Sequence, residues 1–270
     1  MEQRALGRSG LRVPVVGMGT WKTFDVRDAE EVASRKGVVD TALRVGSNLF
    51  DSSPMYGAAE EVLGSALNGR RERAMVATKV WTPDDREAQR QVQRALGWFG
   101  GHVEVYQVHN LVAWQTRLTM LERLRDQGQV QCVGITHYDQ RALPDMLDIM
   151  RSGRVTAIQI PYSVRERAVE REVLAAADDL GIGVIVMRPL GQGALAVRAP
   201  SPEALQPLEA FGVRTWAQAL LKWIVSDSRV TTAIPATTSQ RHAEENAAVG
   251  EPPWFGSDER AYVERLAERI

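Results

Sequence analysis

The stretch "ADDLGIGVIVMRP", residues 177–189, contains the pattern on which the fold prediction depends. It finishes an amphipathic segment, passes through Gly181 and continues into a run of valine and isoleucine. Glycine suits the left-handed residue that follows many helices. A short β-branched run is typical of a buried parallel strand. The stretch therefore predicts the end of a helix and a buried strand directly after it.

The same unit recurs along the chain, so the pattern describes a whole fold. Its other copies are "ALRVGSNLFD" (42–51), "ALNGRRERAMVATK" (66–79), "ALGWFGGHVEVYQVH" (95–109), "LRDQGQVQCVGIT" (124–136) and "MRSGRVTAIQIP" (150–161). The less complete units "VPVVGMGT" (13–20) and "SDSRVTTAIP" (226–235) open and close the series. We expect strands near 14–19, 48–51, 74–79, 103–109, 130–136, 157–161, 183–187 and 230–235, and helices that include 29–45, 86–98, 117–127, 169–180 and 215–226.

Eight units of this spacing predict an α/β fold, a (β/α)8 TIM barrel, in one domain over residues 1–270. The alternative is an open doubly wound sheet, which usually has fewer strands and a glycine-rich first turn. Neither "GMGTW" (17–21) nor "GQGAL" (191–195) matches the G-x-G-x-x-G fingerprint of that turn, which favours the barrel. The segment "RALGRSGLRVP" (4–14) predicts an N-terminal β-hairpin that plugs one end, and 198–207 predicts a long loop.

The composition excludes several classes of protein. With 44% hydrophobic and 25% charged residues, the chain is typical of a globular protein, and its formal net charge of -1 argues against nucleic-acid binding. The apolar runs are too short to cross a membrane, and the N-terminus has no secretion signal. The single Cys132 excludes an intrachain disulfide and a multi-cysteine zinc site, and we expect no metal. These features predict a cytoplasmic enzyme or binding protein without a membrane partner, as a monomer or weak oligomer.

Ionisable residues follow three neighbouring strands of the predicted barrel. Asp51 comes after "NLF", Lys79 after "MVAT" and His109 after "VYQV", while Tyr56 lies in the loop behind Asp51. Lys79 is one of only four lysines among 33 basic residues, so its choice over arginine calls for a reason. Because the carboxyl ends of barrel strands share one face, these side chains are predicted to meet there.

This group of residues has a chemical logic. Tyrosine, with a reference pKa of about 10, is a weak acid near neutral pH until a nearby cation lowers its pKa. Lys79 is predicted to supply that charge, and Asp51 to keep Lys79 protonated and in position. His109 is predicted to orient a carbonyl oxygen or to share in proton transfer. Such a set can deliver a proton to a carbonyl oxygen while hydride reaches the carbon.

At this point the chain resembles the aldo-keto reductase family over nearly its whole length. The resemblance rests on "GMGTW", "FDSSPMYG", "EEVLGSAL", "VATKVW", "VEVYQVHN", "CVGITHYD", "QIPYS", "RPLGQGAL" and "AIPATTSQRHAEEN", which follow the family's order and spacing. It implies an NAD(P)H-dependent reduction of aldehydes or ketones to alcohols. It also implies that Tyr56 is the general acid, that Asp51 and Lys79 tune it, and that His109 orients the carbonyl.

The resemblance further implies a nicotinamide cofactor, NADP(H) by preference, bound without a Rossmann fold. Thr136, His137 and Gln159 lie where the family holds the carboxamide, and Met187 occupies the place of a tyrosine that often stacks on the ring. Arg188 and the loop after it are implied to hold the pyrophosphate. The remaining implied cofactor contacts are Gly19, Thr20, Trp21, Asp51, Pro189, Leu190, Gly191, Gln192, Gly193, Ala236, Thr237, Thr238, Ser239, His242, Glu245 and Asn246.

Two positions of the resemblance leave the choice of cofactor open. Ala236 stands where a lysine often pairs with the 2′-phosphate, and His242 replaces a frequent arginine, although Arg241 is adjacent. NADH is therefore the alternative to NADPH. For the substrate, the matching positions are Trp21, Tyr56, Trp81, His109 and Asn110, which suggest an apolar or aromatic carbonyl compound.

Two other functions stay open at the level of the sequence. One is a regulatory subunit that binds the nucleotide and turns over little. The other is a barrel isomerase or aldolase in which Lys79 forms a Schiff base, which would require a lysine free of a tight ion pair.

Overall fold

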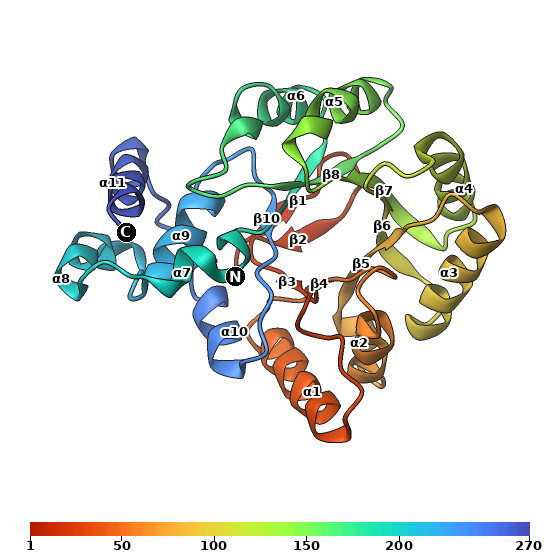
Figure 1. Ribbon diagram of the computed structural model, residues 1–270, viewed down its shortest axis with the longest axis horizontal. Coiled ribbons are helices and arrows are strands. Elements are labelled where there is room, and N and C mark those ends of the chain that lie inside the picture. The colour runs from red at the N-terminus through yellow and green to blue at the C-terminus, as the bar shows by residue number, and fades with distance from the viewer.

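Eight parallel strands form a closed barrel, which confirms the fold class predicted from the repeated unit (Figure 1). The computed structural model describes residues 1–270. The strands are neighbours in sequence order, and parallel bridges from Val16 to Ala233 and from Gly19 to Ala236 close the sheet on itself. They are β3 (Met18–Gly19), β4 (Leu49–Asp51), β5 (Met75–Val80), β6 (Val103–His109), β7 (Val130–Thr136), β8 (Ala157–Pro161), β9 (Gly183–Met187) and β10 (Thr232–Ala233).

Helices between consecutive strands form a ring outside the barrel (Figure 1). Asp28, Asp84, Thr215 and Ser239 begin four of these helices by accepting backbone N–H groups with their side chains. The helices are α1 (Ala29–Arg44), α2 (Ala59–Leu67), α3 (Asp85–Trp98), α4 (Trp114–Asp126), α5 (Leu143–Arg151), α6 (Val173–Asp179), α7 (Ala194–Val197), α8 (Pro202–Leu205), α9 (Trp216–Val225), α10 (Gln240–Ala247) and α11 (Ser257–Glu268). Five short 3₁₀ turns lie at 71–73, 140–142, 168–170, 191–193 and 206–211.

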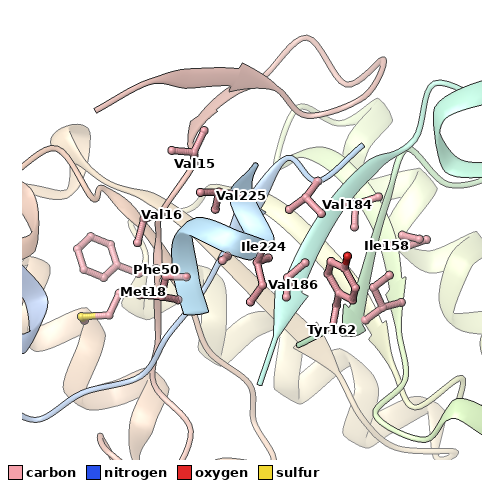
Figure 2. Close-up of a cluster of buried hydrophobic side chains, with 14 of the residues drawn as sticks. Val15, Val16, Met18, Phe50, Ile158, Tyr162, Val184, Val186, Ile224 and Val225 are labelled. Carbon is pink, nitrogen blue, oxygen red and sulfur yellow. The ribbon is translucent and has the colours of Figure 1, made fainter. Parts of the chain in front are cut away.

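The surroundings of strand β9 explain why its sequence, residues 183–187, has no polar face. Val184 and Val186 point outward and pack in the large core between barrel and helices, beside Ile224 of α9 (Figure 2). Ile185 points the other way, into a separate apolar cluster inside the barrel. Because alternate residues of a strand face opposite sides, both sides of β9 must be apolar.

The N-terminal hairpin covers one end of the barrel interior, as predicted. Strands β1 (Gln3–Ala5) and β2 (Arg12–Pro14) pair antiparallel. Leu6, Leu11 and Val13 belong to the same apolar cluster as inward-facing barrel residues such as Ile185. Gly7 has φ +54°, and a Cβ there would lie 2.4 Å from the backbone nitrogen of Gly183, so only glycine lets the hairpin pack this closely. The hairpin closes this end and leaves the other for a ligand.

Several boundaries differ from those predicted. The first and last strands, β3 and β10, are shorter than 14–19 and 230–235, and Pro14 and Val15 pair with the N-terminal segment instead of the barrel. The segment predicted as a loop at 198–207 contains α8, whose first residue is Pro202, a favourable first position. The predicted helix 169–180 is divided into a 3₁₀ turn and α6. None of the helices is long and apolar enough to cross a membrane.

Candidate active site

A cavity of about 400 Å³ opens at the carboxyl ends of the barrel strands. Its volume lies within the range of about 300–1,000 Å³ that is common for small-molecule sites. It is lined by Gly19, Trp21, Lys22, Thr23, Asp51, Met55, Tyr56, His109, Asn110, Tyr138, Gln159, Met187, Arg188, Pro189, Leu190, Gln192, Gly193, Ile234, Pro235 and Ala236. The structure therefore brings Asp51, Tyr56 and His109 to one cavity, together with Trp21 and Gln159. The group holds no cluster of residues suited to a metal ion.

Asp51 and Lys79 form a buried ion pair at the bottom of this cavity. Asp51 is the last residue of β4 and Lys79 lies near the end of the adjacent β5. The ammonium Nζ of Lys79 is 2.7 Å from Oδ1 and 2.8 Å from Oδ2 of Asp51, and it donates a third hydrogen bond of 2.7 Å to the carbonyl of Ser52. An ammonium group has three N–H donors, so Lys79 has none left for another partner. This geometry disagrees with a Schiff-base lysine, which needs a free amine.

Gln159 extends the ion pair across the barrel. Its amide nitrogen donates to Oδ2 of Asp51 at 3.3 Å, and its oxygen accepts from the side chain of Gln107 at 2.8 Å. Burial raises the pKa of Asp51, while Lys79 and these hydrogen bonds act in the opposite direction. Burial likewise lowers the pKa of Lys79, and the adjacent Asp51 opposes that change. The short two-oxygen contact and the shared network hold the pair in one geometry.

Tyr56 lies over this pair and beside His109. The Nζ atom of Lys79 is 5.2 Å from the centre of the Tyr56 ring. The Tyr56 and His109 rings meet edge to face, with centroids 5.8 Å apart and planes at 90°. The turn after β4 brings Tyr56 back to the cavity, since its backbone N–H bonds to the carbonyl of Ser53 at 3.0 Å. Asp51 and Tyr56 thus face one space although they come from a strand and a loop.

The pKa of Tyr56 differs from the expectation drawn from the sequence. Lys79 was expected to lower it, but burial raises it well above its usual value, and the charge of Asp51 adds to the rise. The cation that opposes this rise is Arg188. The reason is that all three donors of Lys79 are directed at Asp51 and Ser52, so the pair as a whole brings little positive charge to the phenol. Tyr56 is therefore held in its protonated form.

His109, the last residue of β6, is buried and neutral. Its pKa is lowered to about 2, first by burial and then by electrostatic interaction with Lys79 and His137. Its Nδ1 atom is 2.9 Å from the hydroxyl of Ser53. The ring of Trp81 lies on another side, with centroids 6.4 Å apart. A neutral imidazole in such a position can donate one hydrogen bond to a ligand and carries no charge of its own.

Two cations and two aromatic rings lie close together in the wall of the cavity. The guanidinium of Arg188 lies 5.0 Å from the ring centre of Tyr138 and 5.8 Å from that of Trp21. The ammonium of Lys22 lies 4.4 Å from the Trp21 ring. Neither cation is in an ion pair with a carboxylate of the chain, unlike most arginines of this protein. Uncompensated positive charge at the edge of a cavity favours an anionic ligand group.

Backbone strain is concentrated at this cavity. Six residues other than glycine have a left-handed backbone, and four of them line the cavity: Lys22 (φ 61°), Asn110 (φ 52°), Arg188 (φ 54°) and Gln192 (φ 58°). Such conformations are unfavourable for residues with a Cβ atom and tend to occur at functional sites. The loops after three different strands are therefore shaped for what the cavity holds.

The remaining residues implied to bind cofactor have different surroundings. Thr136 is buried in β7 between His109 and Gln159, its register partners on the neighbouring strands. His137 stacks on Tyr138 with ring centroids 5.3 Å apart, and its Nδ1 accepts the backbone N–H of Asp139. Gly191 lies in the 3₁₀ turn between lining residues of the same loop. Two implied residues sit just beyond the lining itself: Thr20, which is buried and hydrogen-bonds the Asp51 carbonyl, and Trp81, which is half-exposed.

The segment from Ala236 to Asn246, which we name the β10–α10 end, continues the cavity on one side. Ala236 lines the cavity, and Ser239 caps α10 by accepting the N–H of His242 at 3.3 Å. The buried Thr237 accepts the N–H of Ser239 at 3.0 Å, and Thr238 between them is exposed. His242 is exposed, Glu245 is half-buried and Asn246 is buried, all on α10.

Seven residues of this site were missed in the sequence, among them Thr23, Ile234 and Pro235, which line the cavity. Lys22 and Tyr138 line the cavity directly after Trp21 and His137, and Met55 lies directly before Tyr56. Ser53 does not line it, but its hydroxyl contacts His109. Lys22 could have been found from the rarity of lysine in the chain, and Ser53 from the unusual polar pair between Asp51 and Pro54. No pattern in the sequence pointed to Tyr138.

The chain is similar to known proteins along nearly its whole length. Residues 15–268 match the family model described as "Aldo/keto reductase family". The chain is 26% identical over 259 residues to the methylglyoxal reductase YeaE of Escherichia coli, covering 92% of this chain and 90% of the relative. It is also 26% identical over 310 residues to an NADH-specific methylglyoxal reductase of Escherichia coli, covering 92% and 93%. A solved aldo/keto reductase from Klebsiella pneumoniae, in complex with NADP and acetate, has a TM-score of 0.83 at 22% identity, covering 99% and 96%.

Proposed function

Because the chain belongs to the aldo/keto reductase family, we propose that it reduces an aldehyde or ketone to an alcohol with NAD(P)H, preferring NADPH, and that Tyr56 is the general acid. One observation carries this proposal. The buried Asp51–Lys79 pair, the Tyr56 phenol and the neutral His109 imidazole meet at one cavity. Such a set supplies a proton and a hydrogen-bond donor at one point, as carbonyl reduction requires.

The lining of the cavity suits the nicotinamide and pyrophosphate parts of the cofactor. The cavity is about 400 Å³ in volume, and its unpaired cations Lys22 and Arg188 suit a pyrophosphate. Gln159 and Met187 line the inner part, where an amide and a thioether suit a carboxamide and a flat ring. When bound, the reduced nicotinamide supplies the hydride. Related proteins differ in their cofactor, since one is called NADH-specific and another binds NADP.

The residues of the chain have separate tasks in this proposal. His109 donates a hydrogen bond to the carbonyl oxygen and fixes its position, and its neutral state avoids a second buried charge beside Lys79. Tyr56 holds a proton and releases it to the same oxygen as negative charge develops there. Asp51 and Lys79 do not contact the substrate. They form the rigid, charge-balanced floor on which the Tyr56 ring lies.

The substrate proposed for this cavity is a small apolar or aromatic carbonyl compound. Trp21 and Met55 line the cavity, and the exposed Trp81 lies beside the His109 ring. Asn110 makes one wall polar, and its side-chain oxygen is buried without a hydrogen-bond partner in the chain. A substrate with a hydrogen-bond donor near its carbonyl group would satisfy that oxygen.

The test of the proposal is the variant Tyr56→Phe, with Tyr138→Phe as a matched control. Both lose one phenol hydroxyl from the same cavity, but only Tyr56 lies over Lys79 and beside His109. We expect Tyr56→Phe to lower kcat by about 100-fold or more with 4-nitrobenzaldehyde or methylglyoxal, since positioned proton transfer contributes on this order. Tyr138→Phe should keep its turnover within a few-fold. NADPH consumption measures the rate, and tryptophan fluorescence measures cofactor binding.

The same experiment separates the proposal from its rivals. Wild-type turnover in Tyr56→Phe would contradict the role of the tyrosine. Binding of NADPH by the wild-type chain without reduction of any carbonyl compound would favour a regulatory subunit instead.

A further inference from the structure

The side-chain hydroxyl of Ser53 contacts the imidazole of His109. Ser53 lies between Asp51 and Tyr56 in the turn after β4, and its side chain is fully buried. Its Oγ atom is 2.9 Å from Nδ1 of His109 and 3.2 Å from the backbone nitrogen of Met55. These are the two hydrogen bonds of the Ser53 hydroxyl.

The hydrogen-bond partners of the Ser53 hydroxyl determine whether it donates to His109 or accepts from it. The N–H of Met55 can only donate, so it uses one lone pair of the Ser53 oxygen. A serine hydroxyl has one hydrogen of its own, and Nδ1 of His109 is its one remaining acceptor within reach. If Nδ1 also donated, the buried O–H would have no partner, which is unfavourable. The arrangement that satisfies every group has Ser53 donating to Nδ1.

The protonation state of His109 then determines which ring nitrogen carries a proton. The low pKa of this imidazole keeps it neutral, so it has one ring proton. Because Nδ1 accepts from Ser53, that proton lies on Nε2, the ring nitrogen left for a ligand. His109 itself lines the cavity.

We propose that Ser53 is a positioning residue that holds the neutral His109 in the Nε2–H tautomer, so that the cavity offers a hydrogen-bond donor to the carbonyl oxygen. This inference rests on the proposed carbonyl reduction. In the other tautomer, a lone pair on Nε2 would face the lone pairs of the substrate oxygen and repel it. With the Nε2–H tautomer, His109 and Tyr56 are both donors, so the site selects substrates whose reacting oxygen is an acceptor.

NMR spectroscopy measures the tautomer of His109 directly. Protein labelled with ¹⁵N-histidine gives separate long-range ¹H–¹⁵N patterns for the two neutral tautomers, and the chain has only four histidines. The signals of His109 are assigned by their loss in a His109→Gln variant. We expect the wild-type protein to show His109 protonated at Nε2, and Ser53→Ala to show a mixture of tautomers.

Two further variants separate the hydroxyl from general effects of substitution. Ser52→Ala is the matched control, because Ser52 is an equally buried neighbour whose hydroxyl bonds to Thr20 and does not contact His109. It should leave the His109 tautomer unchanged. Ser53→Thr keeps a hydroxyl and should restore the wild-type pattern.

Kinetics on the same proteins give the second reading. We expect Ser53→Ala to lower kcat about tenfold, the size of one hydrogen bond, with KM for NADPH unchanged, and Ser53→Thr to recover most of the rate. A structural loosening of the turn would lower the rate without changing the tautomer.

The outcomes are distinct. A wild-type His109 protonated at Nδ1, or a Ser53→Ala protein with the wild-type tautomer, would overturn the proposal. A Ser53-dependent tautomer in a protein that reduces no carbonyl compound would support the tautomer assignment and overturn the proposed function.

Discussion

The part of the cavity where Asp51, Lys79, Tyr56 and His109 meet, which we name the reaction end, and the β10–α10 end hold their charges in opposite ways. At the reaction end, Asp51 and Lys79 are only 2% and 1% exposed, and every donor of the lysine has a partner. At the β10–α10 end, the side chain of Arg241 is 73% exposed and pairs with Glu245 four residues along the same helix. One end is a closed network, and the other is a solvent-exposed helix with a local ion pair.

This difference determines how each end responds to substitution. Charges in a buried network interact strongly, and loss of one partner leaves the other without compensation. Charges on an exposed helix are screened by water and salt, so each contributes little. Residues of the reaction end therefore cannot be exchanged one at a time, whereas single exchanges at the β10–α10 end are expected to have small effects.

The largest effect is expected from Lys79→Met, which breaks the buried pair. The variant leaves the Asp51 carboxylate buried without its cation, so the free energy of unfolding should fall by about 3–5 kcal/mol. Arg90→Met, which breaks an exposed i,i+3 pair with Glu87, should lose only a small fraction of that. Urea unfolding monitored by tryptophan fluorescence measures both.

The double variant Asp51→Asn/Lys79→Met refines this test. Because it removes both charges, it should recover part of the stability that Lys79→Met loses, while turnover stays low. Equal stability losses in Lys79→Met and Arg90→Met would show that burial does not distinguish the two pairs.

A second buried carboxylate, Glu60 of α2, should make stability depend on pH. Burial raises its pKa to about 7, and hydrogen bonding from Thr78 at 2.5 Å opposes this only in part. The folded protein therefore binds a proton that the unfolded chain, with its ordinary pKa near 4.5, releases. The resulting stabilisation is present below pH 4.5 and is lost as the pH rises to 7, by about 3 kcal/mol.

Glu60→Gln removes this titration while keeping an oxygen that can accept from Thr78. We expect the variant to match the wild type at low pH and to exceed its unfolding free energy above pH 7. Glu61→Gln, at the exposed neighbouring position of the same helix, should follow the wild type at every pH. Parallel curves for all three proteins from pH 5 to pH 8.5 would contradict a raised pKa for Glu60.

The sequence predicted the barrel because its strands are apolar on both faces, a pattern that β9 illustrates with Val184 and Val186 outside and Ile185 inside. It also predicted that Asp51, Lys79 and His109 meet, since strand ends share one face of a barrel. It did not predict where the donors of Lys79 point, because the Ser52 carbonyl reaches Nζ only through the folded turn. For the same reason the pKa of Tyr56 was expected to fall, although burial and Asp51 raise it.

The smallest effect is expected at the β10–α10 end, from Ala236→Lys. Ala236 is exposed at the edge of the cavity, and the nearby Arg241 is already paired with Glu245 at 2.8 Å. A new lysine would provide a free cation for a 2′-phosphate, so the ratio of kcat/KM for NADPH to that for NADH should rise about tenfold, or about 1.4 kcal/mol. Ala248→Lys adds the same charge at the exposed C-terminal end of α10 and should leave the ratio unchanged.

Varying the ionic strength tests whether the gain in NADPH preference comes from a solvent-exposed charge. Raising the salt from low to about 0.5 M should remove most of the preference gained by Ala236→Lys, because screening shortens the reach of solvent-exposed charges. The same salt should leave the stability difference between the wild type and Lys79→Met nearly unchanged, since that pair is shielded from ions by burial. If salt changed both effects equally, the two ends would not differ in the way that their exposure indicates.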